Sequence, residues 1–161
     1  MKWSKLKKRL EESFSDTIRK RVQIYLTSYR DSNENSRVWI VVDGEEKISL
    51  DNFNSIIQNG AYFNELTPIQ DYLTHKKIEK NERSSNKLYE NGEFSSFDFT
   101  FMARQYLQTP AYKSIQSTHP ILRTLGVLNK KIGIDKIKKL QYDENPMVAY
   151  FAKFRYEAEN K

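Results

Sequence analysis

The chain has 161 residues, a formal net charge of +6 and no cysteine. A chain of this length is expected to form one domain, 1–161, in which we distinguish a lobe at 1–50 and a lobe at 51–161. Without cysteine there is no disulfide framework, thiol nucleophile or thiolate metal site, which fits a reducing cytoplasm. No apolar run is long enough to span a bilayer, so we expect no membrane partner.

The first predicted element is a helix in the sequence WSKLKKRLEESF, residues 3–14. Its large apolar residues recur at spacings of three and four, which places them in one narrow stripe of a helix: Trp3, Leu6, Leu10 and Phe14. A helix that lies in a membrane interface usually presents a wider apolar face over more residues. We therefore expect a helix docked on the core, with its lysines in water.

Three strands are predicted next. Residues 21–30 and 37–42 carry apolar side chains at every second position, which is the periodicity of a strand. Asp43-Gly44 indicates a tight hairpin, because glycine tolerates the positive φ that such turns need. Residues 45–50 form the returning strand, so the sequence predicts a three-stranded antiparallel meander with the N-terminal helix packed on it.

The rest of the chain has helical patterns. Asp51 and Thr67 can begin two short helices, 81–93 has the composition of an exposed loop, and Ser95 with Asp98 forms a capping box for another helix. The predicted fold class is therefore α+β, with the N-terminal helix and meander packed against a larger helical C-terminal portion.

Two segments near the C-terminus resemble each other. In HPILRTLGVLNKKIG (119–133) and NPMVAYFAKFRYEAE (145–159), apolar residues recur at the same offsets from the proline, and Gly126 matches Ala152. This pattern predicts two helices that pack through a shared face, where a small residue permits close approach. They resemble helices of HEAT-like repeats, but a solenoid needs three or more copies, and two similarly capped core helices remain the alternative.

The basic residues are unevenly spread. Residues 1–30 hold nine Lys or Arg against three Asp or Glu, residues 31–109 hold eight against thirteen, and residues 110–141 hold seven against one. The two basic segments either attract the acidic middle of the chain or meet on one face as a positive surface.

A second feature that suggests nucleic acid is the face of the meander opposite its apolar side chains. Aromatic rings flanked by cations on a sheet are what binders of single-stranded RNA use to stack bases and neutralise phosphates. The alternative is that later helices cover this face and its rings are core. The candidate nucleic-acid-binding residues are Lys5, Lys8, Arg21, Tyr25, Tyr29, Arg37, Trp39, Lys130 and Lys131.

Most enzymatic signatures are absent: the chain has no phosphate-binding glycine loop, no H-E-x-x-H and no G-x-S-x-G. We expect the side chain of His75 to be solvated and His119 to lie at a helix cap, so neither histidine is predicted to bind a metal ion. Glu45-Glu46-Lys47 contains an E-x-K fragment of the kind nucleases use for Mg²⁺, but it lies at the predicted hairpin tip. We predict no catalytic, cofactor-binding or metal-binding residue, and a hydrolase is only a third alternative.

Several stretches resemble a family of small uncharacterised bacterial proteins: WSKLKK at 3–8, Arg21 with TSYR at 27–30, RVWIVVDG at 37–44 and RTLGVLNKKIG at 123–133. The resemblance leaves roughly 51–110 unmatched. Members of that family often carry Asp and Arg where this chain has Asn129 and Lys130. The resemblance implies a bacterial origin and assigns no activity, cofactor or partner.

Two functions follow as expectations. The first is a non-enzymatic interaction module that binds a protein partner through its helical portion. The second is a nucleic-acid binder, of RNA in particular, that uses residues 1–30 and 110–141 and the aromatic face of the sheet. Exposure of Tyr25, Tyr29 and Trp39 would favour the second.

Overall fold

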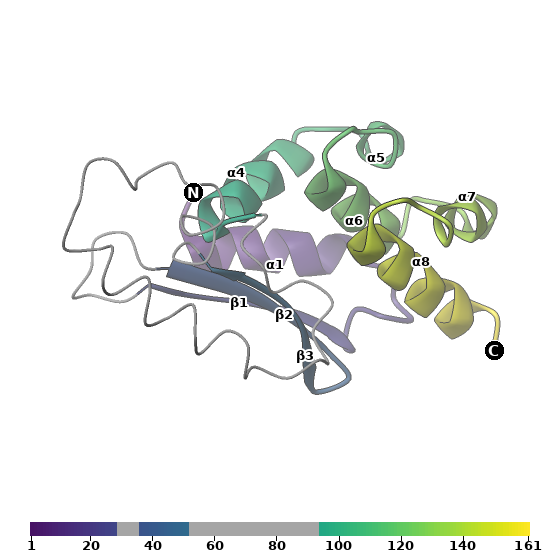
Figure 1. Ribbon diagram of the computed structural model, residues 1–161, viewed down its shortest axis with the longest axis horizontal. Coiled ribbons are helices and arrows are strands. Elements are labelled where there is room, and N and C mark those ends of the chain that lie inside the picture. Colours follow the sequence, from purple (N-terminus) through teal and green to yellow (C-terminus); the bar gives the residue numbers. More distant parts are fainter. Residues whose placement is uncertain (29–35, 52–93) are drawn as a thin grey trace.

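The structure is a computed structural model that describes residues 1–28, 36–51 and 94–161 (Figure 1). It confirms the predicted α+β class, with an N-terminal helix, a three-stranded antiparallel sheet and a helical C-terminal portion. The helices predicted to begin at Asp51 and Thr67, and the loop predicted at 81–93, lie outside the described residues. The elements are α1 (Trp3–Ser13), β1 (Val22–Ser28), β2 (Ser36–Val42), β3 (Glu45–Asp51), α4 (Ser96–Tyr106), α5 (Ala111–Ser114), α6 (Pro120–Leu128), α7 (Ile134–Leu140) and α8 (Pro146–Glu159).

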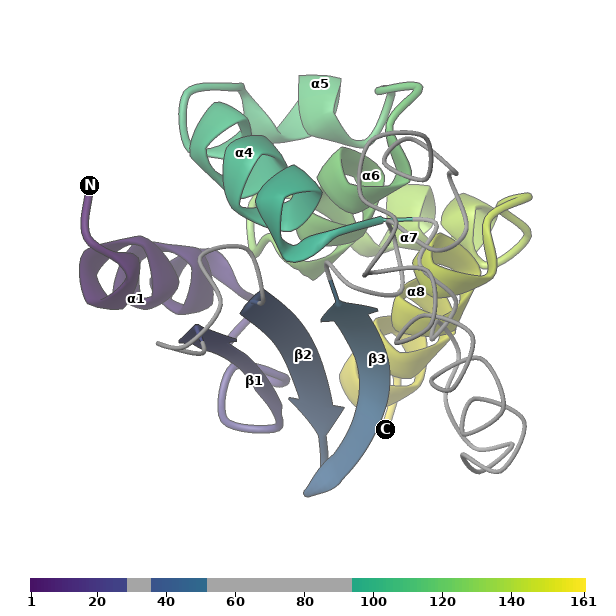
Figure 2. The same ribbon diagram turned by 60° about the vertical axis from the view of Figure 1, so that its left-hand side comes forward.

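The strands lie in the order β1-β2-β3, and the helices lie over one face of the sheet (Figure 2). Every second residue points to that face, so Ile40 pairs with Ile24 on one side and with Ile48 on the other, and all three are buried. Asp43 and Gly44 have φ of +51° and +85°, which confirms the predicted hairpin turn.

Helix α1 is docked on the core, as predicted. Leu6, Leu10 and Phe14 are buried and Trp3 is partly buried against them. One lysine departs from the prediction of solvated lysines: the Lys7 ammonium donates to the carbonyl of Ile24 (2.6 Å) and to Glu11 (2.8 Å). Glu11 also accepts from the Ile24 N–H (3.1 Å), so this ion pair satisfies the edge of β1 as a neighbouring strand would.

The capping box at the start of α4 is confirmed: Ser95 accepts from the Asp98 N–H, and the Asp98 carboxylate accepts from the Ser95 N–H. The helix predicted at 119–133 is too long, because α6 ends at Leu128. Asn129 has an extended backbone and pairs with Phe14, and the Leu128 carbonyl accepts from the Ser15 N–H (2.9 Å). The chain leaves the helix there because its backbone bonds to the residues that follow α1.

Helices α6 and α8 pack against each other, as predicted, and both Leu125 and Phe151 are fully buried. The small residue of α6 has a different neighbour from the one expected. A Cβ on Gly126 would lie 2.8 Å from Cγ2 of Ile115, so the close approach is to the end of α5.

Candidate nucleic-acid interface

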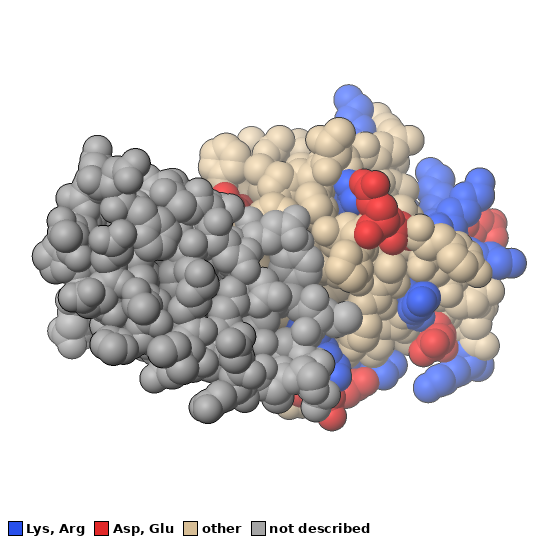
Figure 3. All heavy atoms as spheres, viewed as in Figure 1, with Lys and Arg blue, Asp and Glu red and all other residues tan. Residues whose placement is uncertain are grey.

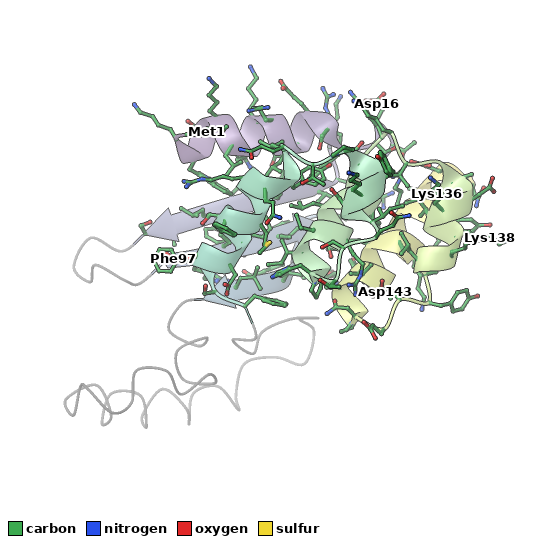
Figure 4. All side chains as sticks on the ribbon, turned by 90° about the horizontal axis from the view of Figure 1, so that it is seen from above. Met1, Asp16, Phe97, Lys136, Lys138 and Asp143 are labelled. Carbon is green, nitrogen blue, oxygen red and sulfur yellow. The ribbon has the colours of Figure 1, made fainter. Side chains whose placement is uncertain are left out.

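The solvent side of α1 carries unneutralised positive charge. Lys5, Lys8 and Arg9 are exposed, and the side chains on the outer side of the helix project away from the body of the protein (Figure 4). Lys8 lies 3.9 Å from Glu12, but both side chains are more than half exposed, so this pair is weak. Lys5 and Arg9 form no ion pair with the described part of the chain. These cations are therefore available to an external anion.

The turn that follows α6 brings Lys130 and Lys131 to the C-terminal end of α1. The Lys130 N–H donates to the carbonyl of Ser13 (2.9 Å), beside the pairing of Phe14 with Asn129. Lys8 lies five residues before Ser13, which is about 7.5 Å along a helix axis. Both lysines of the turn are exposed. We call Lys5, Lys8, Arg9, Lys130 and Lys131 the basic surface; the turn that carries the second predicted lysine pair bonds through its backbone to the end of the helix that carries the first.

A fully buried arginine holds this turn in place. Arg155 of α8 donates to the carbonyls of Val127 (2.6 Å), Asn129 (2.7 Å) and Ile132 (2.6 Å), and to the carboxylate of Glu159 (2.8 Å). Burial raises the pKa of Glu159, but hydrogen bonds from Arg155 and Ser15 outweigh it, so the pKa lies below its usual value. Glu159 thus stays ionised as the counter-charge of the guanidinium.

Asn129 fixes the same turn from the other side. Its side-chain amide donates to the hydroxyl of Tyr106, and its oxygen accepts from the Lys131 N–H (2.8 Å). The Tyr106 hydroxyl also lies 3.2 Å from that of Ser13, so α1, α4 and the turn meet here. Sequence reasoning gave Asn129 no structural role and missed Arg155, although Arg155 lies four residues after the apolar Phe151 and four before Glu159.

A groove of about 390 Å³ runs beside α1. Its lining combines four cations with two carboxylates and one serine: Ser4, Lys7, Lys8, Glu11, Glu12, Arg19 and Lys20. Lys7 and Glu11 are committed to each other, whereas Lys20 is exposed and forms no ion pair with any residue in the described ranges. The groove therefore adds positive charge next to the basic surface.

Helix α7 continues this charge beyond the turn. Lys136, Lys138 and Lys139 are exposed, with Asp135 as the acidic residue of the same helix. Lys136 and Lys138 lie at the opposite end of the protein from Met1 and Phe97 (Figure 4). In the front view, most of the charged atoms outside the grey region lie toward the end that carries α7 and α8 (Figure 3).

The outer face of the sheet is arranged differently. Tyr25 and Trp39 stack with ring centroids 5.4 Å apart, the Lys7 ammonium lies 4.6 Å from the Tyr25 ring, and the Arg37 guanidinium lies 4.9 Å from the Trp39 ring. Arg37 also donates to Glu46 and to Ser49. Tyr25 is 36% exposed and Trp39 is partly buried. Each ring therefore already has partners from the protein, which a stacking base would have to displace.

Arg21 and Tyr29 are the remaining predicted residues. Arg21 donates two hydrogen bonds to Asp43 (2.8 and 2.6 Å), and its guanidinium lies 4.5 Å from the ring of Phe154. The hydrogen bond from Arg21 lowers the pKa of Asp43. Arg21 thus joins the hairpin turn to α8 and is engaged by a carboxylate and a ring, and Tyr29 lies outside the described residues.

The groups considered for catalysis have structural partners. His119 caps α6, where its Nδ1 accepts from the Ile121 N–H (3.3 Å), and Lys47 donates to Glu45. His75 lies outside the described residues. Residues 1–28, 36–51 and 94–161 contain no group of three or more His, Asp or Glu side chains that could hold a metal ion. None of the helices in those ranges is both long and apolar enough to cross a membrane.

Comparisons with known proteins identify the family of this chain but assign it no activity. No curated protein and no solved structure matches the chain. A family model matches residues 2–156, and so includes the stretch from 51 to 110 that the resemblance had left unmatched. The chain belongs to the SF0329 protein family.

Proposed function

We propose that this protein is a non-enzymatic binding protein that holds nucleic acid through its phosphate backbone on the basic surface. One observation supports the proposal: Lys5, Arg9, Lys130 and Lys131 are exposed without an ion pair to any described residue, and they lie on α1 and on the turn whose backbone bonds to the end of α1. Gathering like charges is unfavourable for the free protein, and a polyanion relieves this repulsion while releasing its own counterions.

The proposal predicts binding with little sequence preference. Lysine and arginine contacts to phosphate position a nucleic acid but carry no sequence information. From Lys5 to Ser13 is about 12 Å of helix, which matches three or four nucleotide rises of one strand. The basic surface is thus long enough for several phosphate contacts.

The expectation of a protein partner stays a prediction, as do the bacterial origin and the cytoplasmic location. A protein interface usually centres on buried aromatic or apolar anchors. The basic surface contains none, which is why we prefer nucleic acid as its ligand.

The test is a titration with RNA and DNA oligonucleotides at about 50 and 200 mM salt, the range over which phosphate-driven binding changes most. Wild type should bind at the lower salt and weaken steeply at the higher. The double variant Lys5→Glu with Lys130→Glu should lower affinity for all sequences alike and reduce the salt slope by about two.

The control is Lys113→Glu with Lys153→Glu, which changes the net charge equally at two exposed lysines on α5 and α8. It should bind nearly as well as wild type. No binding by wild type at the lower salt, or equal weakening in both double variants, would remove the basic surface as the site.

A further inference from the structure

Helix α4 displays an aromatic pair that the fold does not use. Phe97 and Phe101 are 59% and 65% exposed, and they lie one helical turn apart on the same face. Arg104 follows three residues after Phe101, is exposed, and forms no ion pair with the described part of the chain. The outward face of α4 thus presents two rings followed by a free cation.

The rest of α4 is rigidly placed, so this face is presented by a fixed helix. Phe99, Ala103 and Tyr106 are buried in the core on the opposite side. The capping box of Ser95 and Asp98 fixes the first turn. Solvent exposure of Phe97 and Phe101 is therefore a property of a well-anchored helix, not of a loose end.

The chain that follows Asp98 is poor in negative charge. The sequence contains no Asp or Glu from residue 99 to residue 134. Asp98, the acidic residue of α4, is engaged in the capping box by its carboxylate. A ligand that combines apolar flat surfaces with negative charge complements two rings and a cation, and unpaired nucleotides have this chemistry.

Helix α4 also lies against α1, the helix that carries part of the basic surface. Tyr106, on the buried side of α4, contacts Ser13 at the end of α1 through its hydroxyl (3.2 Å). The two helices lie side by side, and their N-terminal ends are at the same end of the protein (Figures 1 and 4). A strand held by phosphate on α1 can therefore reach α4 without crossing the protein.

We propose that α4 makes the protein selective for single-stranded nucleic acid, with bases stacked on Phe97 and Phe101 and a phosphate at Arg104. This inference rests on the proposed function. In a duplex the base faces are already stacked on one another, so the two rings gain nothing from it. A single strand exposes those faces, and each stacked base strengthens binding by roughly tenfold or more.

The test compares one oligonucleotide as a single strand and as a duplex at about 50 mM salt, where phosphate contacts are strong. Wild type should bind the single strand more tightly. The variant Phe97→Ala with Phe101→Ala should lose roughly a hundredfold or more for the single strand, about tenfold for each ring, and little for the duplex. Tyr142→Ala is the control, since Tyr142 is 87% exposed in the turn after α7 and should be neutral.

A direct readout uses Phe101→Trp, which keeps a stacking ring. Its added fluorescence should be quenched by the single strand and not by the duplex, and its affinity should match wild type.

If the alanine variant binds single strands as wild type does, the inference fails while phosphate binding on the basic surface stands. If wild type binds neither form, the proposed function itself fails. Loss of self-association or of anionic-vesicle binding in the alanine variant, with single-strand binding unchanged, would assign the face to a second copy or to lipid instead.

Discussion

Helices α6 and α8 begin with the same kind of cap but differ in how much of their surface is buried. Each has a proline in its first turn after a capping side chain, His119 for α6 and Asn145 for α8. In α6 every residue from 121 to 128 is buried, whereas α8 buries one face and leaves Lys153 and Glu157 exposed. Helix α6 contacts α4, α5 and α8, while α8 contacts α6 and α7. The more apolar sequence of α6 and its neighbours on several sides together explain why more of it is core.

The two helices also differ in what they contribute to the basic surface. Helix α6 ends at the turn that carries Lys130 and Lys131, with its last carbonyls in need of donors. Helix α8 supplies those donors through Arg155. The site thus depends on α8, although none of the residues of the basic surface lies on it.

The largest effect is expected from removing that donor. Arg155→Met keeps much of the side-chain volume but leaves three buried carbonyls and the Glu159 carboxylate without their partner. Such losses typically cost about 3–5 kcal/mol. Urea denaturation should show this decrease, and Lys153→Met, an exposed neighbour on α8, should stay within about 0.5 kcal/mol of wild type. An unchanged midpoint for Arg155→Met would contradict the role of the guanidinium.

The shared packing face is tested by the two matching core residues. Leu125 and Phe151 are both fully buried, so Leu125→Ala and Phe151→Ala should each lower the free energy of unfolding by about 2–5 kcal/mol. Denaturant titration measures both. A cost below about 1 kcal/mol for either one would mean that its site collapses or that the helix pair is looser than the structure shows.

Gly126 in α6 and Ala152 in α8 occupy matching offsets, but substitutions at the two positions should destabilise the protein for different physical reasons. Gly126→Ala places a methyl group 2.8 Å from Cγ2 of Ile115, so overpacking should outweigh the gain in helix propensity and cost about 1 kcal/mol or more. Ala152→Gly should also destabilise by about 1 kcal/mol, but through propensity. Thermal unfolding of Gly126→Ala in an Ile115→Ala background tests the side-chain contact: the cost should fall there, and a cost that persists in full would assign it to the Ile115 backbone nitrogen and the Ser114 Cβ, 3.0 and 3.2 Å from the added methyl group.

Local pattern was sufficient for the parts of the fold that local contacts determine. Spacing of apolar residues predicted α1, alternation predicted the strands, and Asp43-Gly44 predicted the hairpin turn. The predicted C-terminal end of α6 was wrong, because the helix ends where its chain bonds to Phe14 and Ser15, more than a hundred residues earlier in the sequence. No local pattern of residues 119–133 contains that contact.

The candidate site, too, was only partly predictable from the sequence. The basic character of Lys5, Lys8, Lys130 and Lys131 is visible in the sequence, but the contact between the two segments that carry them is not, because it depends on the pairing of the end of α1 with the turn after α6. The pair on α4 was missed because Phe97 and Phe101 look like core residues by type, and only the buried positions of Phe99 and Ala103 show which side faces out.

The smallest effect concerns the two caps, and it depends on pH. His119 must be neutral at Nδ1 to accept from the Ile121 N–H, whereas Asn145 does the same for α8 at any pH. Burial lowers the pKa of His119, with Arg123 acting in the same direction and Asp98 opposing it. The folded protein therefore disfavours the protonated ring. The stability that His119 contributes is complete above its ordinary pKa of 6.5 and is lost as the pH falls through that value toward the lower pKa of the folded state.

His119→Asn gives α6 the cap of α8 and removes this titration. Between about pH 7.5 and 5 the free energy of unfolding of wild type should fall relative to the variant, by no more than a helix cap contributes, about 1 kcal/mol. Urea midpoints at several pH values measure the difference, and the contribution of His75 cancels because both proteins carry it. Parallel pH curves for the two proteins would show that the ring does not titrate as a cap, and that the two helix starts differ in sequence only.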